Sequence, residues 1–151
     1  MPEEGGKQVS QPYEQLKLEN QLCFPLYACA RKIMGLYTPV LKPLGLTYTQ
    51  YIVFMVLWEK EKVSVGELGK ALHLDAGTLT PLLKNLEKSG YVTRERMKED
   101  ERVTMICITK KGDELKEACK DIPGKVATAC GRLDPEKAKV LYDILYGLLE
   151  N

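Results

Sequence analysis

Apolar side chains recur at helical spacing in the first third of the chain. The repeat, at intervals of three or four residues, comprises Leu22, Leu26, Ala30, Ile33 and Tyr37. Such spacing places the side chains on one face of a helix, and Pro25 is best tolerated in its first turns. We therefore expect a helix that begins within a few residues of Asn20 and is broken at Pro39. A second apolar helix is expected over residues 49–60.

A short helix and a turn follow. Ser64 and Glu67 have the Ser-x-x-Glu spacing of a capping box, in which each side chain accepts a hydrogen bond from the other residue's backbone N–H. This pair predicts a helix that ends near Leu72, with the turn at His73. Asp75 is suited to cap another helix directly after the turn, because its carboxylate accepts from the free N–H groups there.

Four leucines mark the buried face of this next helix. They lie at positions i, i+3, i+4 and i+7, and are Leu79, Leu82, Leu83 and Leu86. Gly90 is typical of the residue that follows a helix end. Pro81 removes a backbone donor inside the pattern, so we expect either a kink or a helix that begins nearer Thr80.

After Gly90 the apolar period changes from helical spacing to alternation. Residues 91–96 and 103–108 are rich in β-forming side chains, and a highly charged connector, residues 97–102, separates them. Alternating segments of this length on either side of a polar connector predict a β-hairpin with a long polar tip.

Two further helices are expected toward the C-terminus. Thr109 caps the first, which should end near Pro123, and Asp134 begins the second with Pro135 at its first position. The last helix carries an apolar stripe of Val140, Leu141, Ile144, Leu145, Leu148 and Leu149. A terminal helix this apolar needs a covering partner, and we expect a second copy of the chain.

Together these elements predict a mainly α fold with a small β-hairpin wing (α+β), a winged helix-turn-helix with N- and C-terminal dimerisation helices. We expect a single domain over residues 1–151. Its dimerisation and sensor helices should lie at about 18–45 and 112–151, and its DNA-binding region at about 49–111. In such a domain the second helix enters the major groove, where each base pair presents a distinct hydrogen-bonding pattern.

The polar face of that second helix and the hairpin supply the candidate DNA contacts. The helix offers Thr78, Thr80, Pro81, Lys84 and Asn85. The hairpin would place Arg102 or Arg94 in an adjacent minor groove, where negative potential concentrates. For Lys84, Lys88 and Lys98 taken singly, a solvated surface is the simpler interpretation. The ordered assembly as a whole favours DNA binding.

Composition narrows the class of protein. The chain has 151 residues, 44% hydrophobic and 28% charged, so it is too apolar for disorder. A net charge of +1 excludes a general polycation. No apolar run approaches the roughly 18 residues of a transmembrane helix, and residues 1–6 lack the basic and apolar regions of a secretory signal. Five cysteines, an odd number, indicate cytosolic thiols and a cytoplasmic protein.

Cys23 is the candidate reactive group. It is expected in or near the first turn of the first helix, where free N–H groups and the helix dipole favour the thiolate. A thiolate attacks the O–O bond of a peroxide and becomes sulfenic acid. Taken alone, a cysteine on an amphipathic helix is more often a small buried hydrophobe, as we expect for Cys29 and Cys107. His73 is the single histidine and no metal-binding motif is present, so no metal or cofactor is expected.

Several motifs resemble the MarR family of bacterial repressors. They are Ser64-Val65-x-Glu67-Leu68, Asp75-x-Gly77-Thr78-Leu79-Thr80-Pro81, Gly90-Tyr91-Val92-x-Arg94 and Asp100-Glu101-Arg102 followed by Ile108-Thr109-x-x-Gly112. Within that family, Leu18-Glu19-Asn20-Gln21-Leu22-Cys23-Phe24 and Leu46-Thr47-Tyr48-Thr49-Gln50-Tyr51 are similar to the OhrR branch of organic-hydroperoxide sensors. The resemblance covers residue 18 to the C-terminus and places Asp100 with Arg102 among the DNA-binding residues.

The resemblance implies a homodimeric repressor, not an enzyme, that holds a pseudo-palindromic operator in double-stranded DNA and releases it when an organic hydroperoxide oxidises Cys23. In that branch the tyrosines matching Tyr27, Tyr37 and Tyr48 hydrogen-bond the sensor, partly from across the dimer. Some members also carry a resolving cysteine, which forms an intersubunit disulfide with the sensor. Cys130 is favoured for this role over Cys119, and a small external thiol is the third option.

Two other interpretations stay open at this point. One is a MarR-type repressor that is released by a non-covalent aromatic or phenolic ligand. The other is a thiol peroxidase, against which the helix-turn-helix argues.

Overall fold

The computed structural model describes residues 13–131 and 133–150. Residues 1–6, for which the sequence predicts no secretory signal, lie outside the described residues. The helices are α1 (Cys23–Leu41), α2 (Tyr48–Lys60), α3 (Val65–Leu72), α4 (Ala76–Lys88), α5 (Lys110–Cys119), α6 (Ile122–Cys130) and α7 (Pro135–Leu149). The strands are β1 (Lys62–Ser64), β2 (Val92–Arg96) and β3 (Thr104–Ile108). Short 3₁₀ turns span Glu14–Leu16, Leu18–Asn20 and Lys42–Leu44. The mainly α fold with a β-hairpin wing is confirmed.

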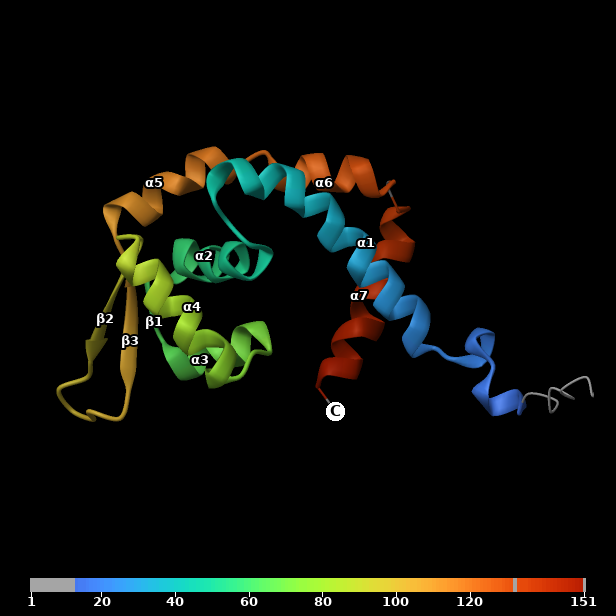
Figure 1. The fold of residues 1–151 in the computed structure, drawn as a ribbon, viewed down its shortest axis with the longest axis horizontal. Helices are drawn as coiled ribbons and strands as arrows, with labels where there is room; N and C mark the ends of the chain where they lie inside the picture. Colours follow the sequence, from blue (N-terminus) through green and yellow to red (C-terminus); the bar gives the residue numbers. More distant parts are fainter. Residues whose placement is uncertain (1–12, 132, 151) are drawn as a thin grey trace, which may run out of the picture.

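The elements fall into two groups. α2, α3 and α4 lie beside the three strands at one end of the molecule, and α1, α6 and α7 lie at the other (Figure 1). α5 runs from the strands toward α6 and so links the two groups (Figure 1). Among the described residues no single helix is long and apolar enough to cross a membrane. α1 with its following turn passes that test only together with α2, across a bend of 75°.

The first helix starts where the sequence predicts and runs further than expected. α1 begins at Cys23 with Pro25 in its first turn, but it continues through Pro39 to Leu41. The expectation of a break at Pro39 is therefore wrong. A proline near the C-terminal end removes one intrahelical hydrogen bond, and burial of Leu41, which is 1% exposed, holds the last turn against the core. α2 then begins after a capping box that joins Thr47 to Gln50.

Both predicted caps of the helix-turn-helix are confirmed. The Ser64 hydroxyl accepts from the Glu67 N–H at 3.1 Å, and the Glu67 carboxylate accepts from the Ser64 N–H at 2.9 Å. The Asp75 carboxylate accepts from the Thr78 N–H at 2.8 Å, so α4 begins at Ala76. The alternative start nearer Thr80 is wrong. This cap and the buried face of the helix fix its first turn, and the helix assignment runs unbroken through Pro81.

Gly90 follows the end of α4 as expected. Its φ of +80° lies in the left-handed region that favours glycine. The Gly90 N–H donates to the Glu87 carbonyl at 2.9 Å, and the Tyr91 N–H donates to the Leu86 carbonyl at 3.0 Å. These two bonds form a Schellman motif, which directs the chain from α4 into β2.

The hairpin is confirmed, but it belongs to a larger sheet. β2 and β3 pair antiparallel, and β1 pairs with the other edge of β3, so the strand order is β1-β3-β2. β1 was not predicted, because three residues are too few to show an alternating pattern. We call β2, the connector 97–103 and β3 the wing.

The helix after the wing ends earlier than expected. α5 stops at Cys119, and Pro123 lies in the first turn of a separate helix, α6. Proline is compatible with a helix start, because the N–H that it lacks has no intrahelical partner there. Cys130 is consequently the last residue of α6.

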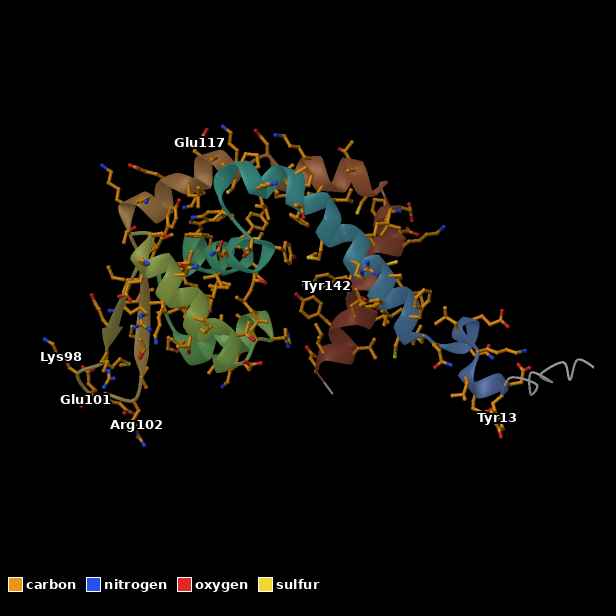
Figure 2. The ribbon with its side chains drawn as sticks, in the orientation of Figure 1. Tyr13, Lys98, Glu101, Arg102, Glu117 and Tyr142 are labelled. Atoms are coloured by element: carbon orange, nitrogen blue, oxygen red, sulfur yellow. The ribbon has the colours of Figure 1, made fainter. Side chains whose placement is uncertain are left out.

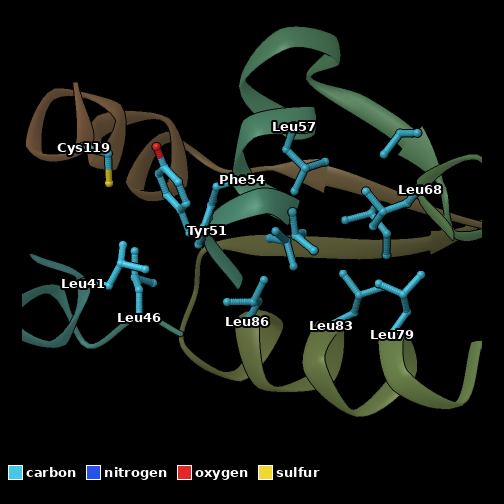
Figure 3. Close-up of a cluster of buried hydrophobic side chains, with 14 of the residues drawn as sticks. Leu41, Leu46, Tyr51, Phe54, Leu57, Leu68, Leu79, Leu83, Leu86 and Cys119 are labelled. Carbon is cyan, nitrogen blue, oxygen red and sulfur yellow. The ribbon is translucent and has the colours of Figure 1, made fainter. Parts of the chain in front are cut away.

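The core fills the space between α2, α3, α4 and the sheet (Figure 3). The predicted leucine face of α4 contributes Leu79, Leu83 and Leu86, each at most 2% exposed. Phe54 and Leu57 of α2 are fully buried beside them. Cys107 is half-buried in β3, but Cys29 is exposed, so the expectation that Cys29 is a core residue is wrong for the single chain.

Gly112 is expected to tolerate no side chain. Its carbonyl accepts from the Trp58 indole N–H at 2.9 Å, which ties α5 to α2. A Cβ there would overlap the Tyr91 carbonyl oxygen and lie 2.8 Å from Ile108 Cγ1. Gly112→Ala should lower the free energy of unfolding by about 1–3 kcal/mol in urea titrations. Gly124→Ala is the control, because its Cβ would meet nothing within 4 Å. Equal stability of both variants would contradict this packing.

Candidate redox sensor and DNA-binding surface

Cys23 occupies the first position of α1 and its side chain is exposed. The residue before it, Leu22, offers no side-chain hydrogen bond to the helix start. The positive end of the helix dipole therefore lies next to the thiol, as the sequence predicts. The N–H groups of the first turn are only partly free, because the Phe24 N–H donates to the Gln21 carbonyl at 3.3 Å and Pro25 has no N–H. Leu22, Phe24 and Leu26 are also exposed, so the sulfur lies on an apolar surface.

Tyr27 lies one turn further along α1 and is 58% exposed. The Arg31 guanidinium carbon lies 5.5 Å from the centroid of the Tyr27 ring. A cation over an aromatic face orients the ring. Of the three candidate sensor tyrosines, Tyr27 is the one that lies within one helical turn of Cys23 in the same chain.

Tyr37 and Tyr48 meet at the other end of α1. Their ring centroids lie 4.7 Å apart, and Tyr51, which the sequence analysis missed, joins them at 5.8 Å from Tyr37. Burial raises the pKa of Tyr48 above its ordinary value. Burial, followed by the neighbouring phenols and Cys119, raises the pKa of Tyr51 to about 12. The phenols therefore stay protonated at neutral pH and can donate hydrogen bonds.

Tyr37 and Tyr48 line a cleft. Its volume is about 370 Å³, and it is lined by Met34, Tyr37, Thr38, Leu41, Lys42, Gly45, Leu46, Thr47 and Tyr48. The space is large enough for a small organic molecule. Its wall combines apolar side chains with two phenols, two threonine hydroxyls and the Lys42 ammonium group, so the cleft suits a guest with an apolar body and hydrogen-bonding groups.

Cys23 does not reach this cleft within one chain. Tyr37 follows Cys23 by fourteen residues on a continuous helix, and the rise of 1.5 Å per residue separates them by about 21 Å. Fourteen residues at about 100° each also return Tyr37 to within about 40° of the helix face of Cys23, but the axial separation excludes contact between these two residues in one chain.

The two candidate resolving cysteines lie in different surroundings. Cys130 is exposed at the end of α6, and α6 packs along α1. It lies near Tyr37, whose pKa is raised by burial first, then by Tyr48 and by Cys130. Cys119 is 3% exposed, and burial raises the pKa of its thiol. Cys130 is thus accessible at the end of a helix that packs along α1, and Cys119 is shielded.

The exposed face of α4 presents every candidate DNA contact predicted there. Thr78, Thr80, Pro81, Lys84 and Asn85 are all exposed. Leu79, Leu83 and Leu86 anchor the opposite face in the core. Small polar groups and one cation therefore project from a helix whose buried side is fixed.

Arg102 lies at the end of the wing, next to Lys98 and Glu101 (Figure 2). Its Nε donates to Asp100 Oδ1 at 3.0 Å, and a second guanidinium nitrogen donates to Oδ2 at 3.1 Å. These bonds and the Arg102 backbone N–H lower the pKa of Asp100. Arg94 instead lies within β2, where its Nε donates to the Glu87 carboxylate at 3.0 Å. Of the two arginines, Arg102 is the one at the tip.

Comparisons with known proteins agree with this geometry. Residues 35–119 match the family described as "Transcriptional regulator SarA/Rot". The chain is also 46% identical to the organic hydroperoxide resistance transcriptional regulator of Bacillus subtilis, over 91% of this chain and 93% of that protein. The chain is a MarR-family regulator of the OhrR branch.

Solved structures of MarR-family regulators have the same fold as this chain. AbfR of Staphylococcus epidermidis, reduced and bound to DNA, is 36% identical over 91% of this chain and 95% of that chain, with a TM-score of 0.75. The disulfide form of AbfR is 38% identical over 90% of this chain and 95% of that chain, with a TM-score of 0.61. Overoxidized AbfR bound to DNA also gives a TM-score of 0.75, so the conformation described here is closer to the DNA-bound forms of AbfR, reduced or overoxidized, than to its disulfide form.

For this MarR-family chain, the sequence did not indicate two residues that contact the candidate site residues. Tyr51 completes the tyrosine cluster, and its position three residues after Tyr48 on α2 could have indicated it. Glu87, which holds Arg94, carried no comparable signal, because α4 and β2 meet only in the fold.

Proposed function

We propose that this chain is a homodimeric repressor that senses organic hydroperoxides through Cys23 and then releases its operator. The observation that carries the proposal is the exposed thiol at the first position of α1, in a chain of the OhrR branch. It would act as a regulator that turns over no substrate, in the cytoplasm, where thiols stay reduced.

The proposed chemistry is a single displacement. The Cys23 thiolate attacks one peroxide oxygen, so an S–O bond forms as the O–O bond breaks. The sulfur is oxidised to sulfenic acid, and the organic peroxide is reduced to an alcohol after its leaving oxygen takes up a proton. A protonated phenol beside the site would stabilise the thiolate and then donate to the leaving oxygen.

A second copy of the chain would complete this site. A single buried residue, Leu41, is found in α1, and α7 has none, although both helices carry large apolar side chains. A twofold dimer through these helices would cover them. It would also bring Cys23 close to Tyr37 and Tyr48 of the partner subunit. Cys23 could then contact these phenols, although about 21 Å separates it from Tyr37 of its own chain.

The proposed DNA contacts follow from α4 and the wing. α4 would enter the major groove with Thr78, Thr80, Pro81, Lys84 and Asn85, and Arg102, held by Asp100, would enter the adjacent minor groove. The twofold axis would set the two half-sites about one DNA turn apart. The likeness to DNA-bound AbfR supports this arrangement.

We expect Cys130 to resolve the sulfenic acid. The dimer that brings Cys23 to the cleft of the partner subunit would bring it near Cys130 as well, because Cys130 ends α6, which packs along α1. Cys130→Ser should therefore abolish the intersubunit disulfide that hydroperoxide produces, as seen by non-reducing electrophoresis. Cys119→Ser is the matched control and should retain it, because Cys119 is buried. A disulfide that survives in Cys130→Ser and disappears in Cys119→Ser would reverse the assignment.

The experiment for the proposed function is an anisotropy titration of labelled promoter DNA before and after cumene hydroperoxide. Release of the DNA that needs a hydroperoxide and is reversed by dithiothreitol supports the proposal.

The cleft of about 370 Å³ favours one alternative function, a repressor released by a non-covalent aromatic ligand. Release by a phenolic acid without thiol oxidation would establish that alternative. Repeated peroxide consumption with a reductant and no DNA binding would instead indicate a thiol peroxidase.

A further inference from the structure

The cleft beside Tyr37 and Tyr48 carries a positive charge at one end. Among the described residues, Lys42 is the one cation that lines this cleft. The lining residues on the side of α1 recur at i, i+3, i+4, i+7 and i+8, and they are Met34, Tyr37, Thr38, Leu41 and Lys42. Such spacing forms one continuous stripe along a helix. Lys42 ends this stripe, directly after the last residue of α1.

The backbone at Lys42 is fixed, whereas its side chain is exposed. The Lys42 N–H donates to the Thr38 carbonyl, and the Lys42 carbonyl accepts from the Gly45 N–H at 3.0 Å. Leu41 and Leu46, on either side of this turn, are 1% and 7% exposed and anchor it in the core (Figure 3). The ammonium group therefore extends from a fixed point on a flexible four-carbon stem, which can adjust to a guest in the cleft.

The elements that form the cleft supply no carboxylate to balance this charge. The sequence from residue 20 to residue 58 contains every lining residue and has no Asp or Glu. α6, which packs along α1, has no acidic residue either. Within residues 13–131 and 133–150, Lys42 forms no ion pair with a carboxylate. A cleft that carries charge of one sign attracts a guest of the opposite sign.

The spacing along α1 defines the shape of this guest. Lys42 follows Tyr37 by five residues of helical backbone, which corresponds to about 7.5 Å along the axis. A guest whose hydroperoxide lies at the phenols would therefore present its far end to Lys42 across a body the size of a benzene ring. The cleft volume of about 370 Å³ is sufficient for such a molecule.

We propose that Lys42 makes the sensor selective for organic hydroperoxides that carry a carboxylate at the end opposite to the peroxide. The Lys42 ammonium group would donate to the carboxylate while Tyr37 and Tyr48 donate to the peroxide oxygens. This inference rests on the proposed function and names the substrate class of the same site. Reduction of the peroxide to the alcohol occurs at Cys23 as described above, and the carboxylate is unchanged by it.

The selectivity should be moderate and sensitive to salt. Lys42 is exposed, so its ion pair with a guest would stay open to water on one side. Such a pair corresponds to a preference of up to about fivefold. Salt should weaken this preference, because the screening length falls from about 10 Å at 0.1 M to about 3 Å at 1 M. A neutral guest of the same shape gains nothing from the charge.

The test compares two peroxides that differ only at the far end. Cumene hydroperoxide is neutral, and its para-carboxy derivative carries a carboxylate across the ring from the peroxide. Mass spectrometry would follow loss of the Cys23 thiol in the reduced full-length protein, and each rate would be divided by the rate with a free thiol. Wild-type protein should prefer the carboxylate by about fivefold at low salt, and the preference should disappear near 1 M salt. The methyl ester should show no preference.

Variants of Lys42 assign this preference to its charge. Lys42→Gln should lower the ratio of the two rates to unity, Lys42→Glu should bring it below unity, and Lys42→Arg should retain it. Lys32→Gln is the matched control, because it removes an exposed cation of α1 that does not line the cleft. This control should keep the wild-type ratio. Circular dichroism melts would confirm that each variant folds.

A wild-type ratio of unity would overturn the inference, and so would a preference that Lys42→Gln leaves unchanged. Failure of both peroxides to oxidise Cys23 would contradict the proposed function instead. Nuclear magnetic resonance titration with para-carboxycumyl alcohol, which has no peroxide, would still decide the role of Lys42. Tighter binding to wild type than to Lys42→Gln would support the inference, and equal binding would overturn it.

Discussion

Cys23→Ser is expected to bind operator DNA with wild-type affinity and to ignore organic hydroperoxide. The side chain is exposed, so the substitution removes no packing contact. A serine hydroxyl stays protonated at neutral pH and does not attack an O–O bond. Wild-type protein should lose at least about tenfold in affinity upon oxidation, within the range of ordinary allosteric coupling. Anisotropy titrations before and after cumene hydroperoxide would measure both proteins.

Cys29→Ser provides the matched control for this experiment. Cys29 is also an exposed cysteine of α1, but it lies beyond the first turn. This variant should respond as wild type does. Release of Cys23→Ser by hydroperoxide, or loss of the response in Cys29→Ser alone, would remove Cys23 from the proposed mechanism.

Ile144→Lys should dissociate the proposed dimer and with it the operator complex. Ile144 is 56% exposed in the single chain, within an apolar stripe of α7 that has no buried residue. A lysine buried in the centre of an interface costs about 2 kcal/mol or more per subunit, which is roughly a thousandfold in the dimer dissociation constant. Sedimentation velocity at micromolar protein would measure the dissociation, and the same sample would be titrated with operator DNA.

Asp143→Lys is the control for Ile144→Lys. It places the same residue on the same helix, about 100° around the axis and away from the apolar stripe. It should remain dimeric. A dimeric Ile144→Lys would show that α7 does not form the interface, and both variants becoming monomeric would indicate a general effect of charge on α7.

Local signals predicted the DNA-binding half well. The caps at Ser64 and Asp75, the leucine face of α4 and the turn at Gly90 each depend on residues close in sequence, and the structure confirms all of them. The misjudged boundaries depend on tertiary contacts. Leu41 draws α1 through Pro39 into the core, and β1 exists only because β3 pairs with it.

The candidate sensor was harder to predict than the fold. Sequence placed Cys23 at a helix start, but helical periodicity shows which face a residue occupies and not how far along the helix it lies. Tyr37 follows Cys23 by fourteen residues, which returns it to within about 40° of the same helix face, and it is nevertheless about 21 Å away along the axis. Cys29 was expected in a core, although the surface that would cover it is absent from a single chain. Such features depend on the assembly, which single-chain patterns do not contain.

The most direct test follows the sulfur and the DNA in one time course. Wild-type protein on labelled operator would be mixed with one equivalent of cumene hydroperoxide per subunit. Samples would be quenched with iodoacetamide, and peptide mass spectrometry would give the fraction of Cys23 still present as thiol while anisotropy gives the fraction of bound DNA. The account predicts that no operator is released before the Cys23 thiol is lost, and that release tracks its oxidation. Operator release while Cys23 remains a thiol would contradict it.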